Sequence, residues 1–180
     1  MSGQREGDQL VAQVVSSAGG QIVGRVRLQK LFYILDQLGL NSDFSYEYHH
    51  YGPYSSDLAE AVEDAAAFGL VSERIERRMS DGVPYSIFES PVISTQGPLG
   101  GLERGAASSA IARMRAEPTI ILELAATIDW LRAVERVADW EEELVRRKGA
   151  KAERDRMERA VALLRDLGLD DDPSTSGGVR

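Results

Sequence analysis

Four carboxylates and two tyrosines form the densest run of chemically active side chains in the sequence. At 100° per residue the four carboxylates share one arc of a helix, and no lysine or arginine interrupts that arc. Such an arc can meet several basic side chains through charge-assisted hydrogen bonds, and the tyrosines can add aromatic contacts like those of stacked bases. An ordinary solvated helix face is the alternative. The predicted partner-binding residues are Tyr51, Tyr54, Asp57, Glu60, Glu63 and Asp64.

Three arginines, Arg74, Arg77 and Arg78, lie in the first arm of a predicted β-hairpin. The dipeptide Asp81-Gly82 between two extended runs is a strong signal for the hairpin turn. In a DNA-binding protein these arginines would contact phosphates, so they are the alternative DNA contacts. Glu73 and Glu76 alternate with them, which favours a charged and soluble edge strand.

The sequence offers no catalytic or metal-binding motif. It contains no cysteine, which excludes disulfides, zinc–thiolate sites and cysteine nucleophiles. Its two histidines, His49 and His50, are adjacent and would point to opposite faces of a strand, so they cannot easily ligate one metal ion. Neither HExxH, GxSxG nor a phosphate-binding loop is found. We therefore expect a non-enzymatic protein without catalytic residues, cofactor or metal.

The overall charge also narrows the function. The net charge of −8 argues against general nucleic-acid binding and against an anionic membrane surface. The first ten residues lack the apolar segment of a signal peptide. The most apolar helical run, residues 119–131, is interrupted by Glu123 and Asp129 and is too short to span a bilayer. We expect a cytoplasmic protein.

Helical periodicity in the first half predicts helices over residues 8–18 and 26–38, and a third helix capped by Ser55 or Ser56. Residues 44–51 alternate as a short strand, and residues 72–89 form the hairpin. Val83, Tyr85 and Ile87 are expected to face a core. The third helix is expected to bury Leu58, Ala61, Val62, Ala65, Phe68 and Gly69, and the central core to combine Leu31, Phe32, Leu35, Leu58, Val62 and Phe68.

The second half is predicted to be helical. A glycine-rich connection over residues 95–105 precedes helices over residues 106–116, from Pro118 onward, and over residues 153–167. Trp130 and Trp140 are expected to pack among these helices. Residues 170–180 have the composition of a disordered tail. A basic patch, diluted by neighbouring glutamates, comprises Arg146, Arg147, Lys148 and Lys151.

These elements predict a mainly α fold of the α+β class. Residues 1–94 would form a winged-helix-like core with a hairpin wing, and residues 95–169 a C-terminal helical unit packed on it in one domain. In a DNA-binding winged helix the third helix enters the major groove and needs hydrogen-bond donors. Here that helix is acidic on its outer side and would repel a duplex.

Three stretches in sequence order resemble a known family. VRLQKLFYILDQLGL is similar to the LQKLxY-type helix of Panacea-domain antitoxins and YwgA-like proteins, and HHYGPYSSDLAEAVEDAAAFGLV resembles the YGPYSxxL helix of the same group. LELAATIDWL followed by KGAKAERDRMERAVALLRDLGL is similar to the C-terminal part of YwgA-like proteins. The resemblance covers roughly residues 27–169. It implies a mostly helical fold around a small winged-helix-like core.

The resemblance also implies a function. A similar domain forms the C-terminal half of DarG antitoxins, where it follows a macrodomain glycohydrolase and occupies the DNA site of the DarT toxin. This chain has no macrodomain, so that hydrolytic activity is not carried over, and its segment after the third helix departs from the DarG pattern. The implied partner is a basic, nucleic-acid-acting toxin or phage-defence effector. A winged-helix transcription regulator is the alternative function, and a homodimer is left open.

Overall fold

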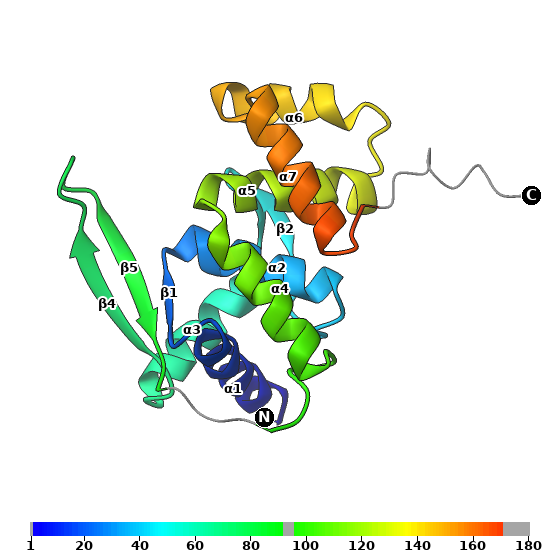
Figure 1. The fold of residues 1–180 in the computed structure, drawn as a ribbon. Helices are drawn as coiled ribbons and strands as arrows, with labels where there is room; N and C mark the ends of the chain where they lie inside the picture. The colour runs from blue at the N-terminus through cyan, green and yellow to red at the C-terminus, as the bar shows by residue number, and fades with distance from the viewer. Residues whose placement is uncertain (1, 92–95, 171–180) are drawn as a thin grey trace, which may run out of the picture.

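A computed structural model describes residues 2–91 and 96–170 (Figure 1). The fold is α+β and mainly helical. In the described residues the helices and strands follow one another as α1 (Ser2–Ser17), β1 (Gln21–Val23), α2 (Arg25–Gln37), β2 (Glu47–His49), β3 (Gly52–Tyr54), α3 (Ser56–Ala67), β4 (Ser72–Arg77), β5 (Pro84–Glu89), α4 (Arg104–Ala116), α5 (Thr119–Asp129), a π-helical turn (Trp130–Val134), α6 (Trp140–Lys148), a 3-10 turn (Gly149–Lys151) and α7 (Arg154–Asp166).

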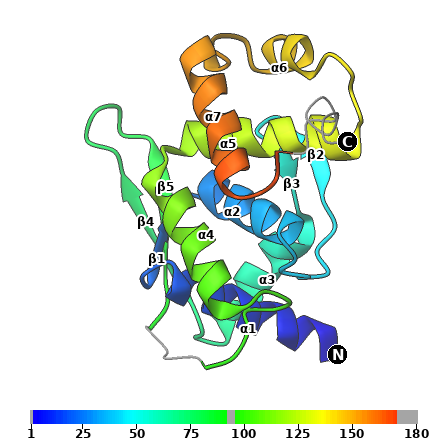
Figure 2. The same ribbon diagram turned by 45° about the vertical axis from the view of Figure 1, so that its right-hand side comes forward.

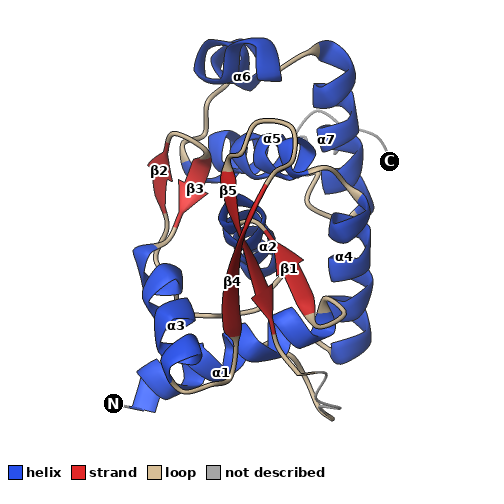
Figure 3. Cartoon of the chain, turned by 90° about the vertical axis from the view of Figure 1, so that its left-hand side faces the viewer, coloured by secondary structure: helices blue, strands red, loops and turns tan. Residues whose placement is uncertain are grey.

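A three-stranded antiparallel sheet closes one side of the first three helices. Its strand order is β1-β5-β4. Strand β1 therefore pairs with β5, the second strand of the β4–β5 hairpin, and β4 lies at the edge of the sheet. Ile22 and Glu73 both pair with Phe88, and the side chains of Ile22 and Phe88 are buried in the core. Beyond this anchored end the β4–β5 hairpin projects away from the helices (Figure 1), and Figure 3 shows its two strands beside β1.

The hairpin forms where the sequence predicts it. The Asp81-Gly82 turn joins β4 and β5, and the Arg78 amide donates to the Val83 carbonyl oxygen across it at 3.0 Å. Gly82 has a φ of 68°, a left-handed conformation that favours glycine. The expectation that Val83 faces the core is wrong, because it precedes the first strand residue in the projecting part and is 46% exposed.

Helix α3 begins as predicted. The Ser55 hydroxyl oxygen accepts the Leu58 amide at 3.1 Å and caps the helix. Leu58, Ala61, Val62 and Ala65 are buried, as their spacing predicts. The prediction for Phe68 is wrong, because the helix ends at Ala67 and the phenyl ring extends past the end of the core.

Phe68 is 68% exposed, and Gly69 beside it is also exposed. The rest of the predicted central core is confirmed, since Leu31, Phe32 and Leu35 from α2 are fully buried beside Leu58 and Val62.

Residues 44–51 are only partly a strand. Pairing is confined to β2, which forms a small antiparallel hairpin with β3. Phe44, Tyr46 and Tyr48 nevertheless all pack against the core, as the alternation predicts. The Phe44 ring lies against Phe32, and the Tyr46 hydroxyl donates to the Asp36 carboxylate at 2.8 Å. Side-chain contacts, rather than a sheet, hold the first part of this segment extended.

Helix α5 is the centre of the second half. It packs against α2 on one side and α7 on another, with α4 running beside α2 (Figure 2). Ile121, Leu122, Ala125, Ile128 and Leu131 are buried, as predicted. The helix is buried all round, so Glu123 and Asp129 are enclosed as well. Two charged groups in the interior need partners, and these lie on α2 and α6.

Trp130 and Trp140 pack as expected. Trp130 follows the last residue of α5, and its ring lies near the rings of Tyr33 and Tyr48. Its indole nitrogen donates to Glu135 at 2.8 Å. The Arg132 guanidinium stands 4.4 Å from the centre of the Trp140 ring. Aromatic and cationic side chains therefore join the π-helical turn to α6.

Two connecting segments differ from simple linkers. Leu99 in the glycine-rich connection is fully buried, so this part is an ordered loop; Thr95 lies outside the described residues. Asp170 was expected to begin a disordered tail, but its carboxylate pairs with Arg132 at 2.9 Å and Arg165 at 3.1 Å. Residues 171–180 lie outside the described residues.

Candidate functional site

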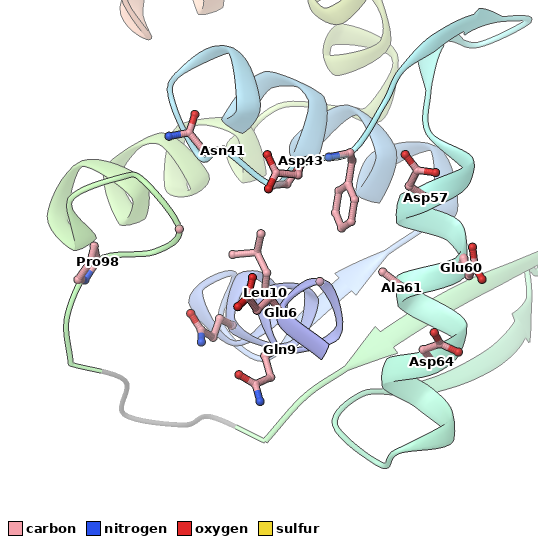
Figure 4. A pocket seen from close by; sticks show the side chains of 15 residues that line it. Glu6, Gln9, Leu10, Asn41, Asp43, Asp57, Glu60, Ala61, Asp64 and Pro98 are labelled. Atoms are coloured by element: carbon pink, nitrogen blue, oxygen red, sulfur yellow. Dashed lines mark hydrogen bonds between the residues drawn. The ribbon is translucent and has the colours of Figure 1, made fainter. Parts of the chain in front are cut away.

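A groove lies between α1, α3 and the two loops at residues 41–44 and 98–100 (Figure 4). Its volume is about 680 Å³. Apolar side chains, including Leu10 and Phe44, form part of its wall. None of its lining residues is lysine or arginine. The carboxylates that line this acidic groove are Glu6, Asp43, Asp57, Glu60 and Asp64.

The carboxylates on α3 are held differently. Glu60 is exposed, whereas Asp64 is half-buried. Asp57 is exposed, but its Oδ2 accepts the Ser45 amide at 2.8 Å and so ties the start of α3 to the preceding loop. Asp57 therefore combines a structural contact with its position on the groove, whereas Glu60 is open to solvent.

A further carboxylate lies beside the groove. Asp8 is 3% exposed, and its Oδ1 lacks a hydrogen-bond partner among the described residues. Burial raises the pKa of Asp8, and the nearby charge of Asp64 raises that pKa further. Burial, with a smaller contribution from the negative charge of Asp64, thus opposes the ionisation of Asp8.

The structure brings together half of the predicted partner-binding residues. Asp57, Glu60 and Asp64 line the groove, while Glu63 is exposed on α3 outside that lining. Tyr51 and Tyr54 were expected at the start of the same helix. Instead they lie in the β2–β3 hairpin and line a different cavity, against α2. Sequence analysis missed Glu6 and Asp43, because no local pattern links either residue to α3.

The hairpin arginines are engaged with neighbouring groups. Arg74 pairs with Glu76 of its own strand and with Glu89 of β5, and Arg78 pairs with Asp81 at 3.0 Å. Arg77 donates to the Gly82 carbonyl oxygen at 3.1 Å. All three arginines are exposed, and the charges of Arg74 and Arg78 are compensated by neighbouring carboxylates, as expected for a protected edge strand.

A second charged cluster lies under the β2–β3 hairpin. The Glu123 carboxylate is 4% exposed and accepts both Lys148 and Lys151 at 3.0 Å. Lys148 also donates to the His50 carbonyl oxygen at 3.1 Å. Lys30 is 1% exposed and donates to the Pro53 carbonyl oxygen at 2.5 Å. We call Lys30, Glu123, Lys148 and Lys151 the lysine cluster.

This cluster corrects the interpretation of residues 146–151 as a surface basic patch. Lys148 is 7% exposed, and Arg147 is bound to Glu135 and Glu143 and lies over the Tyr48 ring. Their sequence spacing resembles that of an exposed helix end. The packing of α6 over Glu123 buries Lys148, while Arg146 stays exposed and Arg147 and Lys151 are partly exposed.

Residues of the LQKLFY stretch seat the hairpin on α2. The Gln29 side chain donates to the Ser55 carbonyl oxygen and accepts the Ser55 amide, both at 2.9 Å. The Tyr33 hydroxyl donates to Asp129 at 2.6 Å. Gly52 has a φ of 89°, and a Cβ there would stand 2.6 Å from the Thr127 hydroxyl oxygen. The YGPYS stretch therefore meets LQKLFY and α5 at one place.

The histidines flank this hairpin. His49 stacks on Tyr54 with ring centres 4.7 Å apart, and His50 meets Tyr51 edge-on at 4.8 Å. Within residues 2–91 and 96–170 there is no group of three histidine or acidic side chains suited to a metal ion. The same part of the chain contains no helix that is both long and apolar enough to cross a membrane.

Comparison with known proteins gives one informative similarity. The chain is 36% identical over 64 residues to the protein named "Uncharacterized protein YwgA" from Bacillus subtilis (strain 168). The aligned part is 36% of this chain and 39% of that relative. No family model matches the chain. The similarity indicates that this chain is related to YwgA, and the name of that relative states no function.

Proposed function

We propose that the protein is a non-enzymatic interaction protein that neutralises a basic, nucleic-acid-acting partner by placing its acidic groove in the partner's nucleic-acid site. The observation that carries the proposal is the groove itself, with five carboxylates and no basic residue in its lining. A nucleic-acid channel is lined by lysine and arginine, so spaced carboxylates on ordered elements can replace phosphates there.

Ordered carboxylates have an advantage over an acidic tail. Helices α1 and α3 contact each other closely, and Asp57 is fixed by the Ser45 amide. Fewer side chains and backbone torsions must then be ordered when the partner binds. The apolar part of the groove wall, at Leu10 and Phe44, adds apolar surface that can be buried when the partner binds.

The fold and the sequence resemblance support the same function. Apart from the β2–β3 hairpin between α2 and α3, the order α1-β1-α2-α3-β4-β5 with sheet order β1-β5-β4 is compatible with a winged-helix-like core. The LQKLFY and YGPYS stretches resemble Panacea-domain antitoxins and YwgA-like proteins, and a similar domain of DarG antitoxins occupies the DNA site of the DarT toxin. We therefore propose an antitoxin of a toxin–antitoxin or phage-defence system, acting in the cytoplasm.

A transcription regulator is a weaker proposal. Its DNA contacts would be Arg74, Arg77 and Arg78; Arg74 and Arg78 are already paired with carboxylates, and Arg77 donates to a backbone carbonyl oxygen. The exposed side of α3, where a regulator would contact the major groove, carries Glu60 and Glu63. The contacts that already engage the hairpin arginines and the negative charge on the exposed side of α3 both oppose direct nucleic-acid binding.

The test is charge reversal in the groove. Glu6→Lys with Glu60→Lys changes the net charge by four without touching Asp57 or the half-buried Asp64. The matched control is Glu142→Lys with Asp155→Lys, which makes the same change at exposed positions on α6 and α7. Binding is measured by calorimetry against the product of the neighbouring gene and against a nona-arginine peptide.

We expect the groove variant to bind at least about tenfold more weakly than wild type, with slower association, and the control to stay within about threefold. Circular dichroism checks that both variants fold. Equal weakening in both variants would mean that only net charge matters. Undiminished binding by the folded groove variant would remove the groove from the interface.

A further inference from the structure

Strand β4 forms one edge of the three-stranded sheet, and no strand of the described residues pairs with its outer side. It lies on the hairpin that projects away from the helices, so another chain can reach it (Figure 1). Ile75, near the middle of β4, is 69% exposed, and Met79 beyond the end of the strand is fully exposed. No residue of β4 lines the acidic groove, so the proposed function makes no use of this edge.

The backbone groups of every second residue of β4 point toward this outer edge. Opposite residues in an antiparallel ladder alternate between pairs that exchange hydrogen bonds and pairs that do not. The Arg78 amide donates to the Val83 carbonyl oxygen, so the other even-numbered residues of β4 bond to β5 in the same alternation. The N–H and C=O groups of Glu73, Ile75 and Arg77 therefore point outward, where a further strand can bind them.

The charges along β4 are complementary to those of an identical strand. Residues 73–77 read ERIER, a pattern that is self-complementary about Ile75 in an antiparallel pair. When Ile75 lies opposite Ile75 of a second copy, Arg74 faces Glu76 of that copy. Glu73 faces Arg77, and the two-fold symmetry repeats both contacts. Opposite charges across two strands stabilise their pairing, so every charged residue in this run favours it.

The neighbouring registers lack this complementarity. The outward backbone groups of two copies meet only when odd-numbered residues lie opposite odd-numbered residues. The nearest other registers that satisfy this rule are centred on Arg74 or on Glu76. The first places Arg74 opposite Arg74, and the second places Glu76 opposite Glu76. Like charges directly opposite each other destabilise a pair of strands, so charge selects the register centred on Ile75.

The ion pairs within one copy are compatible with this register. Arg74 and Glu76 pair with each other, and their side chains are 46% and 42% exposed. Two copies would therefore join four charges of alternating sign around the symmetry axis. On the other face of β4, Arg77 donates to a backbone carbonyl oxygen, and no carboxylate of the described residues pairs with it. Glu73 is bound by Arg25, but a carboxylate has room for further donors.

We propose that the protein forms a symmetric dimer in which the β4 edges of two copies pair antiparallel about Ile75. The result is one continuous sheet with three strands from each copy. Charges that hinder pairing with other strands thus select an identical strand. The same register directs the exposed Met79 toward the chain just after α3 of the second copy, where Phe68 is also exposed.

Sedimentation equilibrium of the full chain from about 1 to about 500 µM tests the dimer. Arg74→Glu places two pairs of like charges across the axis, and so does Glu76→Arg. An equimolar mixture of these two variants restores two opposite pairs between unlike copies. Arg78→Glu is the matched control, because it changes the charge of the same hairpin equally but lies opposite the uncharged Ser72 in this register. Circular dichroism checks that each variant folds.

We expect the wild type and the Arg78→Glu control to dimerise with dissociation constants of about 10–100 µM. Each of the two charge variants should dimerise at least about tenfold more weakly, and their mixture should lie closer to the wild type than to either variant. A wild type that stays monomeric at the highest concentration would overturn the proposal. Equal weakening by Arg78→Glu, or a mixture that does not recover the dimer, would also overturn it.

A cross-link tests the register independently of charge. The sequence contains no cysteine, so Ile75→Cys introduces a single thiol. Opposite residues of a hydrogen-bonded pair have Cα atoms about 5.5 Å apart, which suits a disulfide. Oxidised glutathione should link Ile75→Cys into a dimer and leave Met79→Cys mostly unlinked, because the two copies of residue 79 lie on opposite sides of the axis. Equal linkage of both variants, or no linkage of Ile75→Cys, would overturn the proposal.

Discussion

The acidic groove and the lysine cluster place like charges together in opposite settings. The groove gathers five carboxylates at the surface between α1 and α3, where water and salt screen their repulsion. The lysine cluster gathers three lysines near one buried carboxylate beneath the β2–β3 hairpin; Lys30 and Lys148 are buried, and the Lys151 side chain is 38% exposed. Exposed like charges cost little and remain available to a partner. Buried ones must be satisfied within the fold, and so they fix its geometry.

The largest expected effect comes from breaking the lysine cluster at its single anion. Glu123→Ala leaves Lys148 buried without a counter-ion, and we expect it to lower the free energy of unfolding by about 3–5 kcal/mol. Glu60→Ala removes an exposed groove carboxylate and should change that free energy by less than about 0.5 kcal/mol. Urea unfolding measures both. Similar changes in the free energy of unfolding for the two variants would contradict the difference between the two regions.

This contrast also marks what the sequence could predict. Helical periodicity predicts the shared face of the α3 carboxylates and the buried face of α5. Local residue types predict the Ser55 cap and the Asp81-Gly82 turn. The lysine cluster depends on contacts between residues far apart in the sequence, such as Glu123 with Lys148 and Lys30 with the Pro53 carbonyl oxygen, and no local pattern joins them. Phe68 fails for a related reason, since helical periodicity gives the face of a residue but not where the core ends.

The second prediction concerns the pH dependence of the cluster. The pKa of Lys30 is about 8 in the fold, below the usual value of about 10.4 for an unfolded chain. Between these values the unfolded chain binds a proton that the native protein lacks, so the free energy of unfolding rises with pH.

From pH 7 to pH 10.5 the wild type should gain about 3 kcal/mol relative to Lys30→Met. Urea unfolding of both proteins across this range measures the difference, and other titrating groups largely cancel. A difference that stays constant with pH would mean that Lys30 keeps its charge in the native state.

The smallest expected effect lies at the edge of the acidic groove. Burial and Asp64 raise the pKa of Asp8, so its ionised form is disfavoured in the native state. Asp8→Asn should therefore increase the free energy of unfolding at pH 7 by up to about 1 kcal/mol. The gain should disappear below about pH 4, where Asp8 is protonated in the folded and unfolded chains. Thermal unfolding at both pH values measures it; destabilisation at pH 7 would show that the carboxylate is needed in place.

The most direct test of the central claim, that the acidic groove is the docking surface, is amide hydrogen exchange of the full chain with and without its bound basic partner. We expect slower exchange in residues 6–13, 41–44 and 57–64, which contain most of the groove lining, and a loss of this protection as salt is raised from 50 to about 500 mM. Protection confined to the β4–β5 hairpin or to α6 and α7, with unchanged exchange in the groove, would contradict it.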